Sequence, residues 1–213
     1  MKLTAHVFVS IDGVMQGPGG ADEDRSDGFS HGGWLVPLAD EDMNRIVSDW
    51  FASTDAFLLG HTTYDLFCGF WPQVTQDDLI SREINTRPKY VAATGAVDVG
   101  PWSDTTTVLG SDVIAEIRRL KQQPGRELQI HGSHTLLQAL HGTGLIDEYR
   151  LLVFPVVIGS GKRLFEPAPT PSSFRVVSRD TTSAGATLLN LVPATFSAGT
   201  FAVEDGREVA VTD

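Results

Sequence analysis

The chain has 213 residues, a length that suits one domain of ordinary size. Hydrophobic residues make up 41% and charged residues 20%, which supports a packed core and excludes global disorder. The net charge of -11 argues against DNA, RNA or an anionic membrane as the main partner.

Only one cysteine, Cys68, occurs in the sequence, so neither an intrachain disulfide nor a cysteine-based structural zinc site can form. This usage is typical of a reducing compartment, and we expect a cytoplasmic protein. The apolar start of the chain is short and is interrupted by His6, which favours a first β-strand over a signal peptide. No run of apolar residues approaches the roughly 18 that a membrane span needs.

Hydrophobic periodicity predicts strands that alternate with helices along most of the chain. The expected strands cover residues 3–11, 56–59, 89–93, 105–109, 128–131, 147–158, 174–178 and 186–192. The expected helices run from a cap at Asp40 to about 52, over 62–67, over 77–85, from a cap at 111 or 112 to about 123, and from 133 to about 140. This order predicts an α/β domain with a mostly parallel central sheet, flanking helices and an antiparallel C-terminal edge.

Two segments stand outside this alternation. Residues 15–33 are rich in glycine and aspartate, and loops of this length inside compact domains are usually functional. In the tail, residues 193–213, Asp205 and Gly206 separate two short alternating runs, which predicts either a hairpin or a frayed terminus. We therefore expect one domain over residues 1–192, followed by a separate tail.

Glycine follows two of the expected strands at places where a ligand could approach the backbone. The first junction is the segment 60–63, Gly-His-Thr-Thr, and the second is the pair Gly132-Ser133. Each precedes a helix whose free N–H groups can bind phosphate. The simpler interpretation is that the glycines only turn the chain and the hydroxyls only cap helices. His131 and His134 could suggest a metal pair, but no third ligand is evident, and a capped helix is favoured.

A third glycine-bearing segment, Gly159-Ser160-Gly161, precedes two adjacent cations, Lys162 and Arg163. A dinucleotide-binding loop would continue directly into a helix, but three prolines at 167, 169 and 171 prevent one here. The two cations could bind an anionic substrate, or they could lie on a solvated, bent strand end.

Acid–base chemistry has three candidate groups: Asp12, Asp40 and the acidic run 22–24. Each also has a structural interpretation, because Asp12 can form a turn, Asp40 can cap a helix, and the run can be a solvated loop. No arrangement of serine or cysteine with histidine has the spacing of a nucleophilic site.

Several motifs in order resemble the dihydrofolate reductase-like proteins of the RibD C-terminal type, the riboflavin-biosynthesis reductases. They are Val9-Ser10-Ile11-Asp12-Gly13, Leu58-Leu59-Gly60-His61-Thr62-Thr63-Tyr64, His131-Gly132-Ser133, Leu145 to Arg150, and Pro155 to Phe165. The resemblance covers roughly residues 3–192 and leaves out the tail. It implies a dihydrofolate reductase-like fold with an NADPH site at the carboxyl ends of the strands, where open α/β sheets bind ligands.

The resemblance also implies roles for individual residues. The residues implied to hold the cofactor are Gly13, Gly60, His61, Thr62, Thr63, Gly132, Ser133 and Thr135. The nicotinamide would lie near Asp12 and the segment 15–33, which would close as a lid. The segment from Trp34 to Asp40 is similar to the one that binds the pterin in dihydrofolate reductases, with one extra residue. Trp34 and Asp40 are therefore candidates for binding the substrate and for catalysis, respectively. Lys162 and Arg163 remain candidate substrate-binding residues because of their charge, and Asp12 remains a second catalytic candidate.

One position departs from the pattern of the dihydrofolate reductases, which usually carry arginine where this chain has His61. A neutral imidazole binds a 2′-phosphate less well than a guanidinium does, so NADH is not excluded as the cofactor.

The resemblance favours an NAD(P)H-dependent reductase of a small heterocyclic or carbonyl substrate, of the 5-amino-6-(5-phosphoribosylamino)uracil reductase type. A true dihydrofolate reductase and a non-catalytic protein that binds nucleotides or other small molecules are the alternatives. Relatives of this type commonly pair, so a homodimer is expected, with the late strands and the tail as the suspected surfaces.

Overall fold

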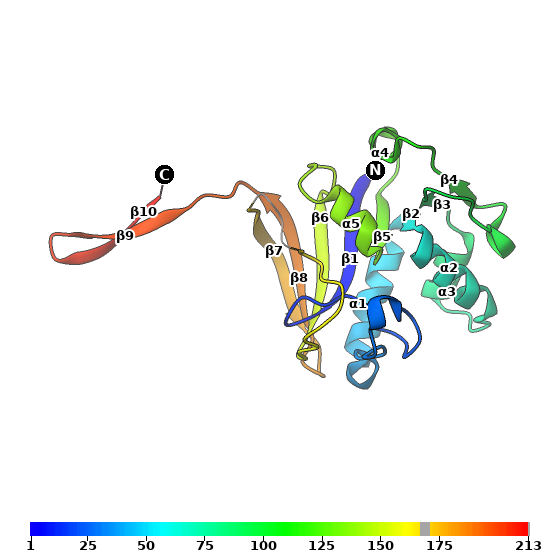
Figure 1. Ribbon diagram of the computed structural model, residues 1–213, viewed down its shortest axis with the longest axis horizontal. Helices are drawn as coiled ribbons and strands as arrows, with labels where there is room; N and C mark the ends of the chain where they lie inside the picture. The colour runs from blue at the N-terminus through cyan, green and yellow to red at the C-terminus, as the bar shows by residue number, and fades with distance from the viewer. Residues whose placement is uncertain (167–170, 213) are drawn as a thin grey trace.

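A computed structural model describes residues 1–166 and 171–212, and two of the three prolines noted above lie outside these ranges. Eight strands form one sheet in the order β4-β3-β2-β5-β1-β6-β8-β7 (Figure 1). They are β1 (Lys2–Ser10), β2 (Thr54–Gly60), β3 (Lys89–Ala92), β4 (Thr106–Val108), β5 (Glu127–His131), β6 (Glu148–Phe154), β7 (Ser173–Thr181) and β8 (Thr187–Ala194). Strands β1 to β6 pair in parallel, and β8 and β7 add an antiparallel edge, which confirms the expected class of fold.

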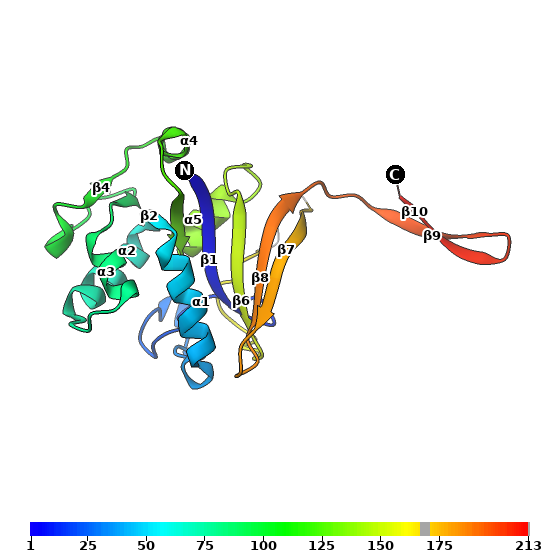
Figure 2. The same cartoon turned by 180° about the vertical axis from the view of Figure 1, so that it is seen from behind.

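Within the described ranges, five α-helices cover the two faces of the sheet. They are α1 (Glu41–Ala52), α2 (His61–Phe70), α3 (Leu79–Thr86), α4 (Val113–Gln122) and α5 (His134–Leu140). Helix α1 lies on one face of the sheet and α5 on the other, as the opposite views in Figures 1 and 2 show. The expected cap is confirmed at Asp40, whose side chain accepts a hydrogen bond from the backbone N–H of Met43 at 2.7 Å.

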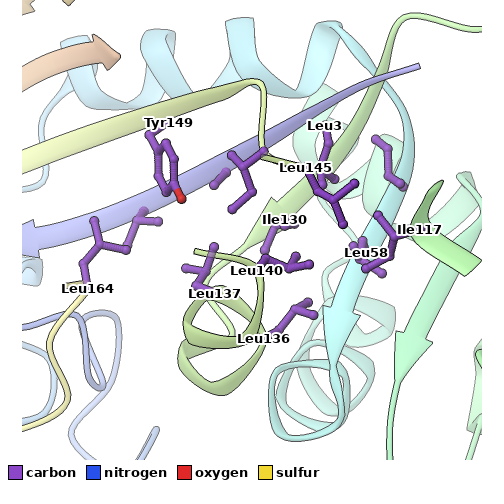
Figure 3. Close-up of a cluster of buried hydrophobic side chains, with 14 of the residues drawn as sticks. Leu3, Leu58, Ile117, Ile130, Leu136, Leu137, Leu140, Leu145, Tyr149 and Leu164 are labelled. Carbon is purple, nitrogen blue, oxygen red and sulfur yellow. The ribbon is translucent and has the colours of Figure 1, made fainter. Parts of the chain in front are cut away.

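Successive side chains of β1 point alternately to these two faces of the sheet, so β1 contributes to the core on both sides. Leu3, Ala5, Val7 and Val9 pack into a cluster with apolar residues of α4 and α5. Figure 3 shows this cluster, with Ile117 of α4 and leucines 136, 137 and 140 of α5 among its labelled side chains. The intervening residues of β1 point to the face covered by α1, and three of them, Thr4, His6 and Ser10, are polar and buried. The sheet therefore has one apolar face and one face with a buried polar region.

Strand β6 ends at Phe154, four residues before the expected end at 158. Pro155 has no N–H to continue the ladder, and the carboxylate of Asp12 accepts hydrogen bonds from the N–H groups of Ile158 and Gly159. Gly159 has a φ of 86°, so the chain turns there. Helix α2 is longer than expected: it continues through Gly69 to Phe70, whereas the predicted helix ended at residue 67.

The tail forms a hairpin of β9 (Gly199–Glu204) and β10 (Arg207–Thr212), which turns at Asp205-Gly206. Both turn residues have positive φ, as the hairpin prediction required. Figures 1 and 2 show this hairpin projecting from the eight-stranded body. Among the described residues, no helix combines the length and the apolar character needed to cross a membrane.

Candidate functional site

A cavity of about 1360 Å³ opens at the carboxyl ends of the central strands. Its walls come from the ends of β2, β3, β4 and β5, from α1 and from part of the segment 15–33. Strands β2 and β5 are neighbours, but α2 and α5, which follow them, pack against different core clusters. The loops therefore diverge above these two strands, which creates the kind of crevice where open α/β sheets bind ligands.

The two predicted glycine junctions meet at this crevice. The Ser133 hydroxyl accepts a hydrogen bond from the N–H of Gly60 at 2.8 Å and donates one to Thr63 at 2.9 Å. A Cβ at Gly60 would lie 3.2 Å from the Ser133 oxygen, so a larger residue there would force the Ser133 side chain to shift by a few tenths of an ångström. Ser133 has a φ of 66° and makes no side-chain cap on α5, so the expected capping role is wrong. Its hydroxyl instead joins the two loops.

The remaining residues of these junctions also line the cavity. Gly132 has a φ of 63°, and a Cβ there would meet no atom within 4 Å. His61, Thr62 and Thr135 lie along the same wall. The structure therefore brings together seven of the eight residues predicted to hold a cofactor, and the exception is Gly13.

The cavity lining also includes two histidines that the sequence analysis did not select as ligand-binding residues. His6 of β1 and His131 of β5 line the cavity beside Trp50 and Phe51 of α1. The two imidazole rings stack with their centroids 4.8 Å apart and an angle of 11° between their planes. The alternation of β1 and β5 could have indicated that both histidines share one face. It could not indicate that this face ends at a cavity.

A buried network of charged and polar groups lies behind the two histidines. The guanidinium of Arg150 binds Glu127 at 2.6 Å and Glu148 at 2.7 Å, and all three side chains are less than 15% exposed. Gln129 donates to the Glu127 carboxylate at 2.7 Å and contacts His131 at 2.9 Å. Burial, followed by the positive charge of Arg150, lowers the pKa of His131 to about 3, so this imidazole is neutral at physiological pH.

The segment 15–33 covers one side of the cavity and is held there by specific contacts. Lys162 donates to Asp24 at 2.7 Å and to the Ser26 hydroxyl at 2.6 Å. Burial would raise the pKa of Asp24, but the hydrogen bonds from Lys162 and Ser26 lower it to about 2. Glu23 is half-buried, and burial raises its pKa. The acidic run is therefore not simply a solvated loop, because its three residues line the cavity and two of them are half-buried.

Asp12 and Arg163 do not line the cavity. The Asp12 carboxylate accepts hydrogen bonds from the Ser10 hydroxyl and from two backbone N–H groups, and the Ser10 bond lowers its pKa far below the usual value. Arg163 donates to the backbone oxygens of Asp12 and Gly159. Gly13 belongs to the same turn. These contacts give Asp12, Gly13 and Arg163 a structural role in joining the ends of β1 and β6.

Asp40 and Trp34 also lie outside the cavity lining. Besides capping α1, the Asp40 carboxylate accepts a hydrogen bond from the N–H of Ala184 at 2.7 Å. The Trp34 indole donates to the backbone oxygen of Gln16 and packs against Phe154. Of the predicted substrate-binding residues, only Lys162 reaches the cavity, and its charge is already paired with Asp24.

Comparisons with known proteins agree with this architecture. Residues 1–188 match the RibD C-terminal domain family. The uncharacterized protein YyaP of Bacillus subtilis is 25% identical over 187 residues, which cover 86% of this chain and 90% of YyaP.

Two solved structures have the same fold. A pyrimidine reductase-like protein from Corynebacterium diphtheriae superposes with a TM-score of 0.61, at 12% identity and with 92% of each chain covered. The diaminohydroxyphosphoribosylaminopyrimidine deaminase/5-amino-6-(5-phosphoribosylamino)uracil reductase of Thermotoga maritima gives a TM-score of 0.59 at 13% identity. The match covers 91% of this chain and 56% of the Thermotoga maritima protein. The fold is therefore that of the RibD-like reductases with a dihydrofolate reductase architecture, and the chain belongs to the RibD C-terminal domain family.

Proposed function

We propose that this protein is a cytoplasmic, NADPH-dependent reductase of a small, flat heterocyclic substrate. The observation that carries the proposal is the crevice above β2 and β5, where the Gly60 and Gly132-Ser133 junctions meet at a large cavity. Membership of the RibD C-terminal domain family supports an oxidoreductase, and the uracil reductase from Thermotoga maritima suggests the class of substrate.

The size of the cavity supports binding of two reactants together. Pockets for one small ligand usually measure about 300–1000 Å³, and this cavity measures about 1360 Å³. Gly132 leaves open space above its backbone, so a phosphate of the dinucleotide can approach closely there. When bound, reduced nicotinamide supplies hydride, while the chain itself orients the two reactants and excludes water with the segment 15–33.

Dihydrofolate is a less suitable substrate for this site. A carboxylate at Asp40 would have to reach the bound pterin, but the structure places it at the start of α1, with partners in Met43 and Ala184. Dihydrofolate nevertheless belongs in the panel of substrates, beside the aminouracil compound, as a direct test of this distinction.

A matched pair of glycine variants tests the cofactor site. Gly132→Ala and Gly142→Ala place the same methyl group at positive φ, where neither Cβ would meet an atom within 4 Å, but only Gly132 lines the cavity. Both should lower the free energy of unfolding by about 1 kcal/mol. Titration calorimetry should show that only Gly132→Ala weakens NADPH binding, by about tenfold, because its methyl group occupies the space for the phosphate. If wild-type protein binds neither NADPH nor NADH, the proposed function is wrong.

We also propose that two copies pair through the tail hairpin and β7. Phe201 and Val203 on the hairpin are 72% and 79% exposed, and a lone two-stranded hairpin is at best marginally stable in water. The hairpin carries three carboxylates, at Glu204, Asp205 and Glu208, against one arginine, whereas the edge strand β7 carries two arginines, at 175 and 179, against one carboxylate, Asp180. This charge complementarity favours a second copy of the chain as the partner.

Removal of residues 196–213 should convert the dimer to a monomer in light scattering, while NADPH affinity is unchanged because the cavity lies elsewhere. The full-length double variant Phe201→Lys, Val203→Lys should do the same, since it places positive charge opposite the arginines of β7 in the proposed contact. A monomeric wild-type protein, or a dimer that survives both changes, would disprove this mode of pairing.

A further inference from the structure

The stacked pair of His6 and His131 has no role in the site as described so far. Both imidazoles line the cavity, although His6 is only 2% and His131 only 9% exposed. Trp50 meets the His6 ring at 4.8 Å, and Phe51 meets the His131 ring at the same distance. The wall is therefore aromatic, with nitrogen atoms as its polar groups.

Gln129 determines which nitrogen of His131 carries the proton. The amide nitrogen of Gln129 lies 2.7 Å from the backbone oxygen of Trp50 and 2.7 Å from the Glu127 carboxylate. Both of these oxygens can only accept, so the amide oxygen must face His131, whose Nε2 lies 2.9 Å away. Nε2 of His131 is therefore the donor, and Nδ1 is left with a free lone pair.

Neither Nδ1 atom of the pair has a hydrogen-bond partner among the described residues. For His6, Nε2 is 2.9 Å from the Thr4 hydroxyl, and Nδ1 is buried and unpaired. For His131, the Nε2 bond to Gln129 is its one hydrogen bond within the described chain. Buried polar atoms are normally paired, and of these two atoms Nδ1 of His6 is the one that is fully buried. Nδ1 of His131 is open to the cavity, where a donor on a ligand can reach it.

The surroundings also restrict the charge of that ligand. Burial, then the neighbouring His131 and Arg150, lower the pKa of His6 well below its ordinary value, and the pKa of His131 is lowered as well. Arg150, the cation whose charge acts on both imidazoles, is already paired with Glu127 and Glu148. Among the described residues beside the two rings, no positive charge is therefore available for an anion, and an uncharged group fits better.

We infer that His131, oriented by Gln129 and stacked on His6, is the hydrogen-bond acceptor that selects an uncharged heteroaromatic ring carrying an N–H donor. The inference rests on the proposed reductase function, because the selected ring would be part of its substrate. His6 acts as a positioning residue, since its ring supports that of His131 by stacking.

Two substitutions at His131 separate its two nitrogens. His131→Asn keeps an acceptor at the same number of bonds from Cα as Nδ1, whereas His131→Gln keeps a donor equivalent to Nε2 and has no group at Nδ1. Thermal melting should show that both variants fold. The Asn variant loses the contact to Gln129 and retains the acceptor, and the Gln variant does the reverse.

Uracil and 1,3-dimethyluracil serve as probes, because they share a flat ring and only uracil has N–H donors. In nitrogen-15 NMR spectra of wild-type protein, uracil should shift the Nδ1 resonance of His131, and the dimethyl analogue should not. Uracil should bind about tenfold more tightly than its analogue, the effect expected of one buried hydrogen bond. The preference should persist in His131→Asn and disappear in His131→Gln.

NADPH titrations on the same samples distinguish the two proposals. If NADPH binds to wild type and to both variants but uracil and its analogue bind equally, or uracil leaves Nδ1 unmoved, the role of His131 is wrong and the reductase proposal stands. If uracil binds through Nδ1 but no dinucleotide binds, the proposed reductase function fails, and His131 remains a ligand-binding residue.

Discussion

Replacing Arg150 with methionine should lower the free energy of unfolding by about 3–5 kcal/mol, measured by urea denaturation near neutral pH. Arg150 is the shared partner of Glu127 and Glu148, whose side chains are only 10% and 8% exposed. Removing the guanidinium leaves Glu127 buried with only neutral donors within reach, while Glu148 keeps its ion pair with Lys2. The large cost comes mainly from the uncompensated charge of Glu127 and less from the lost contacts.

Two further variants show whether buried charge causes this loss of stability. In the triple variant with Glu127→Gln and Glu148→Gln added, most of the lost stability should return, because no buried charge is left unpaired. Arg119→Met is the control, since Arg119 forms a surface ion pair with Glu116 and is 67% exposed. Its cost should stay below about 1 kcal/mol. An equally large loss in the triple variant would show that packing, not charge, is responsible.

Acid should destabilise this protein well above the pH at which carboxylates are protonated. In the unfolded chain both histidines have a pKa of about 6.5, whereas in the folded chain that of His131 is about 3 and that of His6 is also strongly lowered. As the pH falls below 6.5, the unfolded state binds protons that the folded state does not, so stability decreases. The slope should approach about 1.4 kcal/mol per pH unit for each histidine.

The window from about pH 6.5 to pH 4.5 isolates this effect, because unfolded carboxylates bind protons mainly below it. His6→Gln and His131→Gln should each reduce the slope by about 1.4 kcal/mol per pH unit, which corresponds to one proton. In the double variant, the free energy of unfolding should be nearly independent of pH in this window. Measurements near pH 8, where wild-type histidines are neutral in both states, give the packing cost of each variant separately. A wild-type slope that survives in the double variant would contradict the assignment.

Local signals in the sequence predicted most of the fold. The spacing of apolar residues predicted the positions of the strands and helices. The cap at Asp40 and the turn at Asp205-Gly206 depend on residue types that act within a few positions of the chain. The early end of β6 was missed because it depends on Asp12, which is 146 residues away from Ile158.

The site shows the same division between local and distant effects. The glycine junctions were recognised because small residues after strands have few other uses, and both junctions line the cavity. Lys162 and Arg163 were candidates for binding an anionic substrate or for a solvated strand end, but each is bound to a carboxylate of its own chain, Asp24 and Asp12. Charged side chains are easily recognised in a sequence, whereas the partners that neutralise them are brought close only by folding.

By itself, the sequence determined the class of fold, the order of its elements and the two loops that meet above β2 and β5, because these follow from short-range periodicity and turn chemistry. Only the tertiary structure decided that His6 and His131 stack beside a cavity. Their strands pair in parallel across 125 residues of chain, at the register His6 to His131. Contacts of that range depend on the whole sheet being assembled, and no local pattern encodes them.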